Sequence, residues 1–114
     1  MNFDEYQKAA LTTETDGNED RSIDSRAFHT KLLGLIGETG EIAEKFKKIY
    51  RDNDGKMSQE QLDDMKKELG DVLWYIATVA EYLGINMQDI AEFNIEKLAS
   101  RKKRGKLQGS GDNR

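Results

Sequence analysis

The sequence predicts an all-α protein, a single domain of four helices arranged as a bundle. In two long segments the apolar residues recur at spacings of three, four and seven, which is the period of one helical face. The 114 residues contain no proline, so no residue of that kind interrupts a long helix. We find no alternating segment of Val, Ile and Thr bounded by turn residues, so strands are not expected. The length fits one domain over residues 1–114.

The first half of the chain holds two predicted helices. The first lies within residues 1–15. Residues 14–24 are polar, acidic and rich in turn formers, which predicts a loop. The second helix covers residues 25–50, with Asp24 or Ser22 as its N-cap. Its apolar stripe comprises Phe28, Leu32, Leu35, Ile42, Phe46 and Ile49.

The second half holds two more helices. The third covers residues 59–83, opens on a capping box at Ser58–Gln61, and has Gly84 as a natural terminating residue. Its apolar stripe comprises Leu62, Met65, Leu69, Val72, Leu73, Ile76 and Leu83. The fourth helix covers residues 87–104, with Asn86 as its N-cap. Because the turn between them is short, we expect the third and fourth helices to be neighbours.

Composition narrows the possible functions. Residues of the types AVILMFWYC make up 36% and charged residues 35%, a thin core that we expect a homo-oligomer to complete. The 18 basic and 22 acidic residues give a net charge of −4, which argues against nucleic-acid polymers or anionic membranes as partners. The lack of cysteine excludes disulfides and thiolate zinc sites. With no long apolar run and no signal peptide, we expect a cytoplasmic protein.

Two predicted helices each carry a pair of carboxylates. Glu38 and Glu41 belong to the second helix, Glu68 and Asp71 to the third, and each pair is spaced by three residues. The members of a pair therefore lie on one helix face, about one turn apart. If the two helices pack antiparallel, all four carboxylates converge at one edge of their interface. One such pair is common on a solvated helix, whereas two pairs beside two apolar stripes favour a site.

Four carboxylates in one place repel one another, and a divalent cation compensates for their charge. An all-oxygen donor set selects Mg²⁺, for which Mn²⁺ substitutes, over zinc or copper. A di-iron site would need Glu-x-x-His pairs, and His29, the one histidine, is not preceded by Glu at that spacing. Gly37, Gly40 and Gly70 lie inside these helices, where each costs up to about 1 kcal/mol relative to Ala. We expect them to let a neighbouring helix, a ligand or metal-bound water come close.

The last predicted helix carries a polar, mostly basic stripe. Asn94, Lys97, Arg101 and Arg104 are spaced by three, four and three residues, so they share one face. Two interpretations stay open. The stripe balances the negative end of the helix dipole, or it holds a polyphosphate through the forks of Arg and the point charge of Lys.

Residues 105–114 form a glycine-rich tail. The tail is either a frayed terminus or a segment that folds over a ligand. In the second case its glycines permit close approach to a phosphate, and Ser110, Asn113 and Arg114 supply donors. The chain has no Walker A motif, which excludes a P-loop enzyme.

Together these motifs resemble the signature of the MazG-like nucleoside triphosphate pyrophosphohydrolases, an all-α family. The resemblance rests on Glu38-x-x-Glu41 and, after 26 intervening residues, Glu68-x-x-Asp71. It extends to Asn94-x-x-Lys97-Leu-x-x-Arg101, and the ending Gly-Ser-Gly-Asp-Asn-Arg is similar to that of compact single-domain members. The similarity covers most of the chain from Leu33 onward.

The resemblance implies hydrolysis of (deoxy)nucleoside triphosphates between the α- and β-phosphates, giving a monophosphate and pyrophosphate, as in house-cleaning of the nucleotide pool. It implies Mg²⁺ held by Glu38, Glu41, Glu68 and Asp71. It also implies a homodimer, or a tetramer built from two dimers, with sites near the subunit contacts. The predicted substrate-binding set is Asn94, Lys97, Arg101, Arg104, Tyr75, Asn113 and Arg114.

Some roles stay open. A carboxylate that is not fully used as a ligand takes the proton of the attacking water, and Glu38 and Glu41 are the catalytic candidates beside an acid outside the ligand set. The candidates for base recognition are Phe3, Tyr6, Gln7, Phe28, His29, Trp74 and Tyr75. Two other functions fit the same residues: a non-enzymatic helical adaptor with solvated acids, and a pyrophosphohydrolase for another nucleotide-like substrate.

Overall fold

The computed structural model describes residues 1–15 and 20–114, and these residues form four helices and no strands. The helices are α1 (Phe3–Leu11), α2 (Arg26–Asn53), α3 (Gln59–Tyr82) and α4 (Met87–Lys103). The all-α prediction is confirmed, and each helix lies where the apolar period places it. Residues 16–19, part of the predicted loop 14–24, lie outside the described residues.

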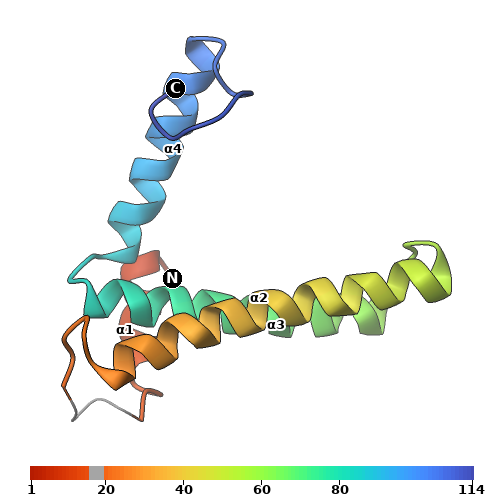
Figure 1. Cartoon of the computed structure of the whole chain (residues 1–114), viewed down its shortest axis with the longest axis horizontal. Coiled ribbons are helices and arrows are strands. Elements are labelled where there is room, and N and C mark those ends of the chain that lie inside the picture. The colour runs from red at the N-terminus through yellow and green to blue at the C-terminus, as the bar shows by residue number, and fades with distance from the viewer. Residues whose placement is uncertain (16–19) are drawn as a thin grey trace.

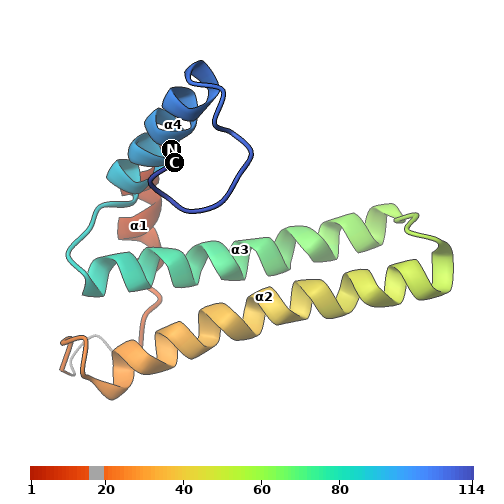
Figure 2. The ribbon, with the colours of Figure 1, turned by 45° about the horizontal axis from the view of Figure 1, so that its top comes forward.

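The two longest helices form an antiparallel hairpin, with α2 and α3 packed side by side along their length (Figures 1 and 2). Asp54 and Gly55 adopt left-handed φ angles of 51° and 79°, which reverse the chain at the end of α2. The predicted capping box opens α3: the Ser58 hydroxyl accepts from the Gln61 amide, and the Gln61 side chain accepts from the Ser58 amide. Local chemistry thus fixes the hairpin turn.

The predicted N-cap of α2 is wrong. Ser25, and not Asp24 or Ser22, caps the helix, and its Oγ accepts a hydrogen bond from the Phe28 amide at 3.0 Å. Ser25 is buried, while Asp24 and Ser22 are exposed. Packing of the first turn of α2 therefore selects Ser25 over the two polar residues shortly before it, a choice that local sequence preference leaves open.

A short helix, α1, crosses one end of the hairpin and ties α3 to α4. The buried Gln7 side chain donates through Nε2 to the carbonyls of Ala77 (3.4 Å) and Ile85 (3.1 Å), and it accepts from the Met87 amide at 2.9 Å. The core here is a small cluster of Ala10, Ala77, Ala80 and Met87. Gln7 thus supplies a partner to the Ile85 carbonyl before α4 and to the Met87 amide in its first turn.

The fourth helix turns away from the hairpin (Figure 1). Gly84, at φ 68°, terminates α3 as predicted. The expectation that the third and fourth helices pack as neighbours is wrong, because α4 packs against α1 instead. Asn86 occupies the N-cap position, but its side chain makes no capping hydrogen bond; the Asp4 carboxylate accepts from the Gln88 amide at 3.3 Å. α1 therefore fixes the direction of α4.

The apolar stripes of the hairpin are only partly covered. Ile49 and Met65 are buried as expected, at 5% and 6% exposure. Leu62, Leu69 and Leu83 of the predicted α3 stripe are exposed. No helix among the described residues is long and apolar enough to cross a membrane.

Candidate metal and nucleotide site

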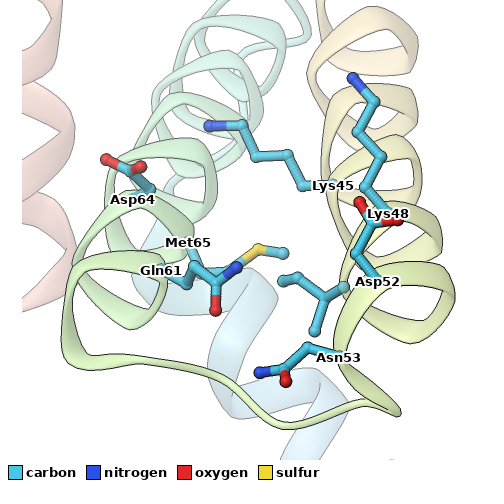
Figure 3. A pocket seen from close by; sticks show the side chains of 8 residues that line it. Lys45, Lys48, Asp52, Asn53, Gln61, Asp64 and Met65 are labelled. Carbon is cyan, nitrogen blue, oxygen red and sulfur yellow. The ribbon is translucent and has the colours of Figure 1, made fainter.

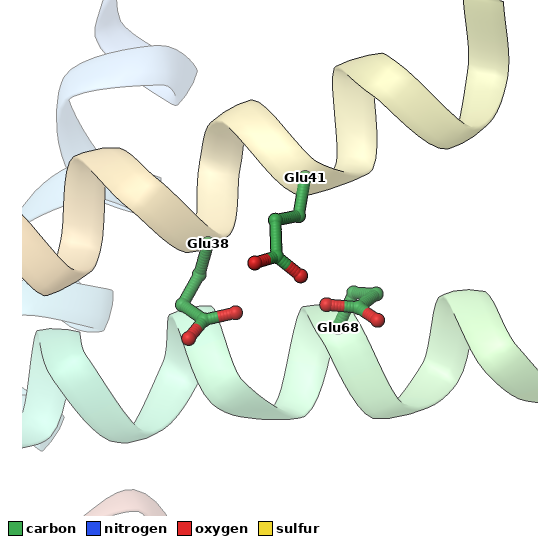
Figure 4. Close-up of side chains that lie close together, drawn as sticks. All are labelled: Glu38, Glu41 and Glu68. Carbon is green, nitrogen blue, oxygen red and sulfur yellow. The ribbon is translucent and has the colours of Figure 1, made fainter.

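Three of the four predicted acids come together where α2 faces α3. One carboxylate oxygen each from Glu38, Glu41 and Glu68 lies within 4.8 Å of the others (Figure 4). Glu38 and Glu41 are one turn apart on α2, and the antiparallel packing brings Glu68 of α3 opposite them. The expected convergence thus follows from the helix period together with the hairpin.

The charges in this cluster are mutually unfavourable. Partial burial raises the pKa of the Glu38 carboxyl, and the negative charges of Glu41, Asp71 and Glu68 raise it further. A cation bound among these oxygens would relieve the repulsion. An all-carboxylate set matches the preference of hard divalent cations such as Mg²⁺ and Mn²⁺, so the residues present fit the predicted metal.

The fourth predicted acid, Asp71, is not in the group of three. It is exposed on α3, one turn from Glu68. Its charge still reaches Glu38, and it also raises the pKa of the Tyr6 phenol, where burial is the larger cause. Asp71 therefore lies on the side of the cluster that faces α1.

A lysine that the sequence analysis did not single out lies against the cluster. Lys45 Nζ is 2.5 Å from Glu68 Oε1, and this hydrogen bond raises the pKa of the Lys45 ammonium. The spacing contained the signal, because Lys45 is four residues beyond Glu41 and so occupies the same face of α2. Glu68 thus already has a cationic partner within the chain.

The glycines beside the acids do not serve the contact between α2 and α3. A Cβ built on Gly37, Gly40 or Gly70 would meet no atom of the described residues within 4 Å, so contact between α2 and α3 does not require them. A Cβ on Gly34, by contrast, would overlap the ring of Tyr75. Gly34 is the glycine that lets an α3 side chain approach the α2 backbone.

The aromatic candidates have structural partners. Tyr75 is half-buried against Gly34, one turn from Asp71, and stacks edge-on against Trp74 with ring centroids 5.0 Å apart. The Trp74 indole donates to the Ala10 carbonyl and to Thr13 Oγ1. Phe28 is buried, whereas Phe3 and His29 are exposed and Tyr6 is half-buried. Tyr75 and Phe28 both lie between the two acidic helices, Tyr75 against Gly34 and Phe28 against Tyr82.

The basic stripe lies on α4, which projects away from the hairpin of α2 and α3 (Figure 2). Two of its cations converge on one residue of the tail: Lys97 Nζ and an Arg101 nitrogen lie 3.7 and 3.4 Å from Asp112 Oδ1. Arg101 also donates to the Asp112 carbonyl at 2.6 Å. It is 4% exposed, and its Nε has no hydrogen-bond partner among the described residues. Asn94 is exposed.

The tail is folded and not frayed. The Arg114 guanidinium donates to the carbonyls of Lys106, Leu107 and Gly111, and Arg104 donates to the Arg114 carbonyl at 3.0 Å. Arg104 and Arg114, two of the predicted substrate contacts, thus hold the tail against α4, while Asn113 is exposed. The contacts with the tail thus hold the side chains of the basic stripe in place.

A family model describes this combination of acidic hairpin and basic helix: the MazG nucleotide pyrophosphohydrolase domain matches residues 26–105. The chain belongs to the MazG family. The MazG match includes the acid cluster, Lys45 and the basic stripe, and it leaves out α1 and most of the tail. The gene 37 protein of Mycobacterium phage L5 is 47% identical over 116 residues, covering 100% of both chains. No solved structure matches.

Membership of the MazG family makes the acid cluster chemically meaningful. MazG proteins act on nucleotides and depend in general on a divalent metal. In this MazG chain the three converging carboxylates are the group among the described residues with the spacing of a metal site.

Proposed function

We propose that this chain is a Mg²⁺-dependent nucleoside triphosphate pyrophosphohydrolase that removes unwanted nucleotides from the cytoplasmic pool. The proposal rests above all on the convergence of Glu38, Glu41 and Glu68 within 4.8 Å in a MazG hairpin. Asp71 completes the ligand set. Mn²⁺ substitutes for Mg²⁺, because both prefer oxygen ligands.

The reaction is a single displacement at the α-phosphorus. Water forms the new P–O bond, the bond from the α-phosphorus to the α–β bridging oxygen breaks, and pyrophosphate leaves with that oxygen. Glu38 or Glu41 accepts the proton of the water. A metal held by Glu38, Glu41, Glu68 and Asp71 would neutralise phosphate charge and orient the water. Lys97 and Arg101 stabilise the charge that develops on the phosphates.

We propose further that the enzyme is a homodimer, or a tetramer of two dimers. Leu33 and Ile36 are 67% and 69% exposed, and they share one face of α2 with Gly37 and Gly40, whose surroundings are open. Phe93 and Ile95 of α4 are likewise exposed, as are other apolar side chains along the hairpin. A second copy packed on these surfaces would bury them and bring a basic α4 toward an acid cluster.

The test is a panel of standard and oxidised (d)NTPs with Mg²⁺, scored for pyrophosphate against orthophosphate. We expect equal amounts of pyrophosphate and monophosphate, no diphosphate intermediate, and complete loss of activity with EDTA. Stepwise release of orthophosphate would contradict the proposed cleavage position. An inactive protein that also fails to bind Mn²⁺ would favour the adaptor interpretation.

A further inference from the structure

A cavity of about 230 Å³ lies at the far end of the hairpin, between the last turns of α2 and the first turns of α3 (Figure 3). Lys45 belongs to both this cavity and the acid cluster, because its ammonium binds Glu68 while its side chain lines the cavity. Lys45 is four residues beyond Glu41 on α2, which is about 6 Å along the axis. The cavity therefore begins where the acid cluster ends.

The lining has an apolar part and a polar part. Ile49 and Met65 supply the apolar part, and both are buried. The polar groups come from the facing sides of both helices: Lys45, Lys48, Asp52, Asn53, Gln61 and Asp64. Two ammonium groups and two carboxylates cancel in charge. The cavity thus has no net charge that would select a free phosphate.

Most of the charged lining groups have partners. Lys45 binds Glu68, Asp52 binds Arg51 at 2.7 Å, and Asp64 binds Lys67 at 2.9 Å. Lys48 forms no close ion pair with the residues that the structure describes, and its charge adds to that of Arg51 in lowering the pKa of the Asp52 carboxyl. Asn53 uses its side-chain nitrogen for the Lys56 carbonyl. The Lys48 ammonium is a donor of the rim, and the Asn53 side-chain oxygen is an acceptor.

We infer that this cavity receives the nucleobase of the substrate whose phosphates lie at the acid cluster. The inference rests on the proposed function. A base presents apolar faces, which suit Ile49 and Met65, and an edge of donors and acceptors, which suits the polar rim. The cavity is smaller than the roughly 300–1,000 Å³ of pockets for drug-sized ligands, so it fits one ring system and not a whole nucleotide. The ribose would span the one helical turn of α2 that separates the cavity from the acid cluster.

The Lys48 ammonium gives the site a preference. An ammonium donates and never accepts, so it favours a base with a carbonyl at its edge, such as guanine, over adenine. A charge-assisted hydrogen bond of this kind changes selectivity about 10- to 150-fold.

The test compares K48M with K47M, its matched control on the same helix. Lys47 pairs with Glu44 and does not line the cavity. We expect K48M to lower the kcat/KM ratio of dGTP to dATP by tenfold or more. Neither variant should change the inhibition constant of inorganic tripolyphosphate, which has no base. K47M should keep the wild-type ratio.

Failure of the two proposals would look different. Suppose that the wild type releases pyrophosphate, but that K48M lowers kcat/KM equally for dGTP and dATP and also weakens inhibition by tripolyphosphate. The base site is then wrong and the proposed function stands. Deoxyguanosine, which has no phosphate, tests the cavity without any activity: its titration should shift the NMR signals of residues 45–53 and 61–65. Absence of those shifts would overturn the base site even if turnover is normal.

Discussion

At the residue scale, the acid cluster combines mutual repulsion with one internal cation. Glu38 experiences the charges of three other carboxylates, while Glu68 is paired with Lys45. These acids therefore contribute little to the stability of the protein, because like charges close together are unfavourable. Their arrangement is better explained by binding than by folding.

Replacing a single acid should separate activity from stability. We expect E41Q and D71N each to abolish Mg²⁺-dependent turnover while leaving the helical circular dichroism unchanged and the melting temperature equal or higher, since each change removes a repelling charge. E44Q, an exposed acid outside the cluster, is the control and should retain wild-type activity. Near wild-type turnover of E41Q would remove Glu41 from the ligand set.

Lys45 should compete with metal for Glu68. In K45M one positive charge beside the carboxylates is lost, so a divalent cation is attracted more strongly. We expect calorimetric titration with Mn²⁺, in the absence of nucleotide, to give a lower dissociation constant for K45M than for the wild type or K47M. An unchanged or higher dissociation constant would show that metal and Lys45 do not share Glu68.

At the element scale, one glycine controls how closely α2 and α3 pack. G34A places a methyl group against the Tyr75 ring and should destabilise the protein by about 1–3 kcal/mol, as overpacking does. G37A adds a methyl group in open space within a helix and should stabilise an isolated chain by up to about 1 kcal/mol. Urea denaturation of both variants measures the difference, and equal midpoints would contradict it.

Contacts with the tail hold the side chains of the basic stripe on α4 in place. R101A should lower kcat/KM about 10- to 150-fold if Arg101 contacts phosphate, because a charge-assisted contact is lost. K102A changes an exposed neighbour and should have almost no effect. A thermal melt on the same preparations identifies any loss of stability from the broken contact with Asp112. An unchanged kcat/KM would leave Arg101 with a structural role alone.

The sequence predicts elements better than it predicts the contacts between them. The helices and the capping box at Ser58 depend on neighbours within four residues, so the pattern contains them. The Asp112 partner of Arg101 depends on a tail that folds back, and the Tyr75 contact of Gly34 depends on the exact register of the hairpin. The direction of α4 depends on Gln7, a polar residue with no periodic signal.

The candidate site follows the same division. Glu38, Glu41 and Glu68 were found because the three-residue spacing and the antiparallel hairpin are enough to bring them together. Lys45 was missed although it lies on the same face, because lysines at four-residue spacing from glutamate are ordinary on helix surfaces. The position of Asp71 relative to the other acids depends on small rotations of α3 that the period leaves undetermined.

At the scale of the whole molecule, an open hairpin and a projecting helix leave much apolar surface uncovered. We expect light scattering at micromolar concentration to give a dimer or tetramer of the 13.0 kDa chain. I36E places a charge on the exposed α2 face and should shift the mass toward the monomer and lower activity together. K47M, on an exposed polar part of α2, is the control. A wild-type monomer with full activity would contradict the proposed assembly.

The Gln7 contact also governs the order in which a newly made chain can fold. α2 and α3 are joined by five residues, so their pairing is complete as soon as α3 has been synthesised. The partners of Gln7 lie 70 to 80 residues further along the chain, at Ala77, Ile85 and Met87. α1 is synthesised before α3 and can pack on it once α3 has emerged, but Gln7 completes its hydrogen bonds only when the start of α4 is present, because these contacts close the longest loop. Until then the Gln7 side chain lacks its partners at Ile85 and Met87, and the docking of α1 is incomplete.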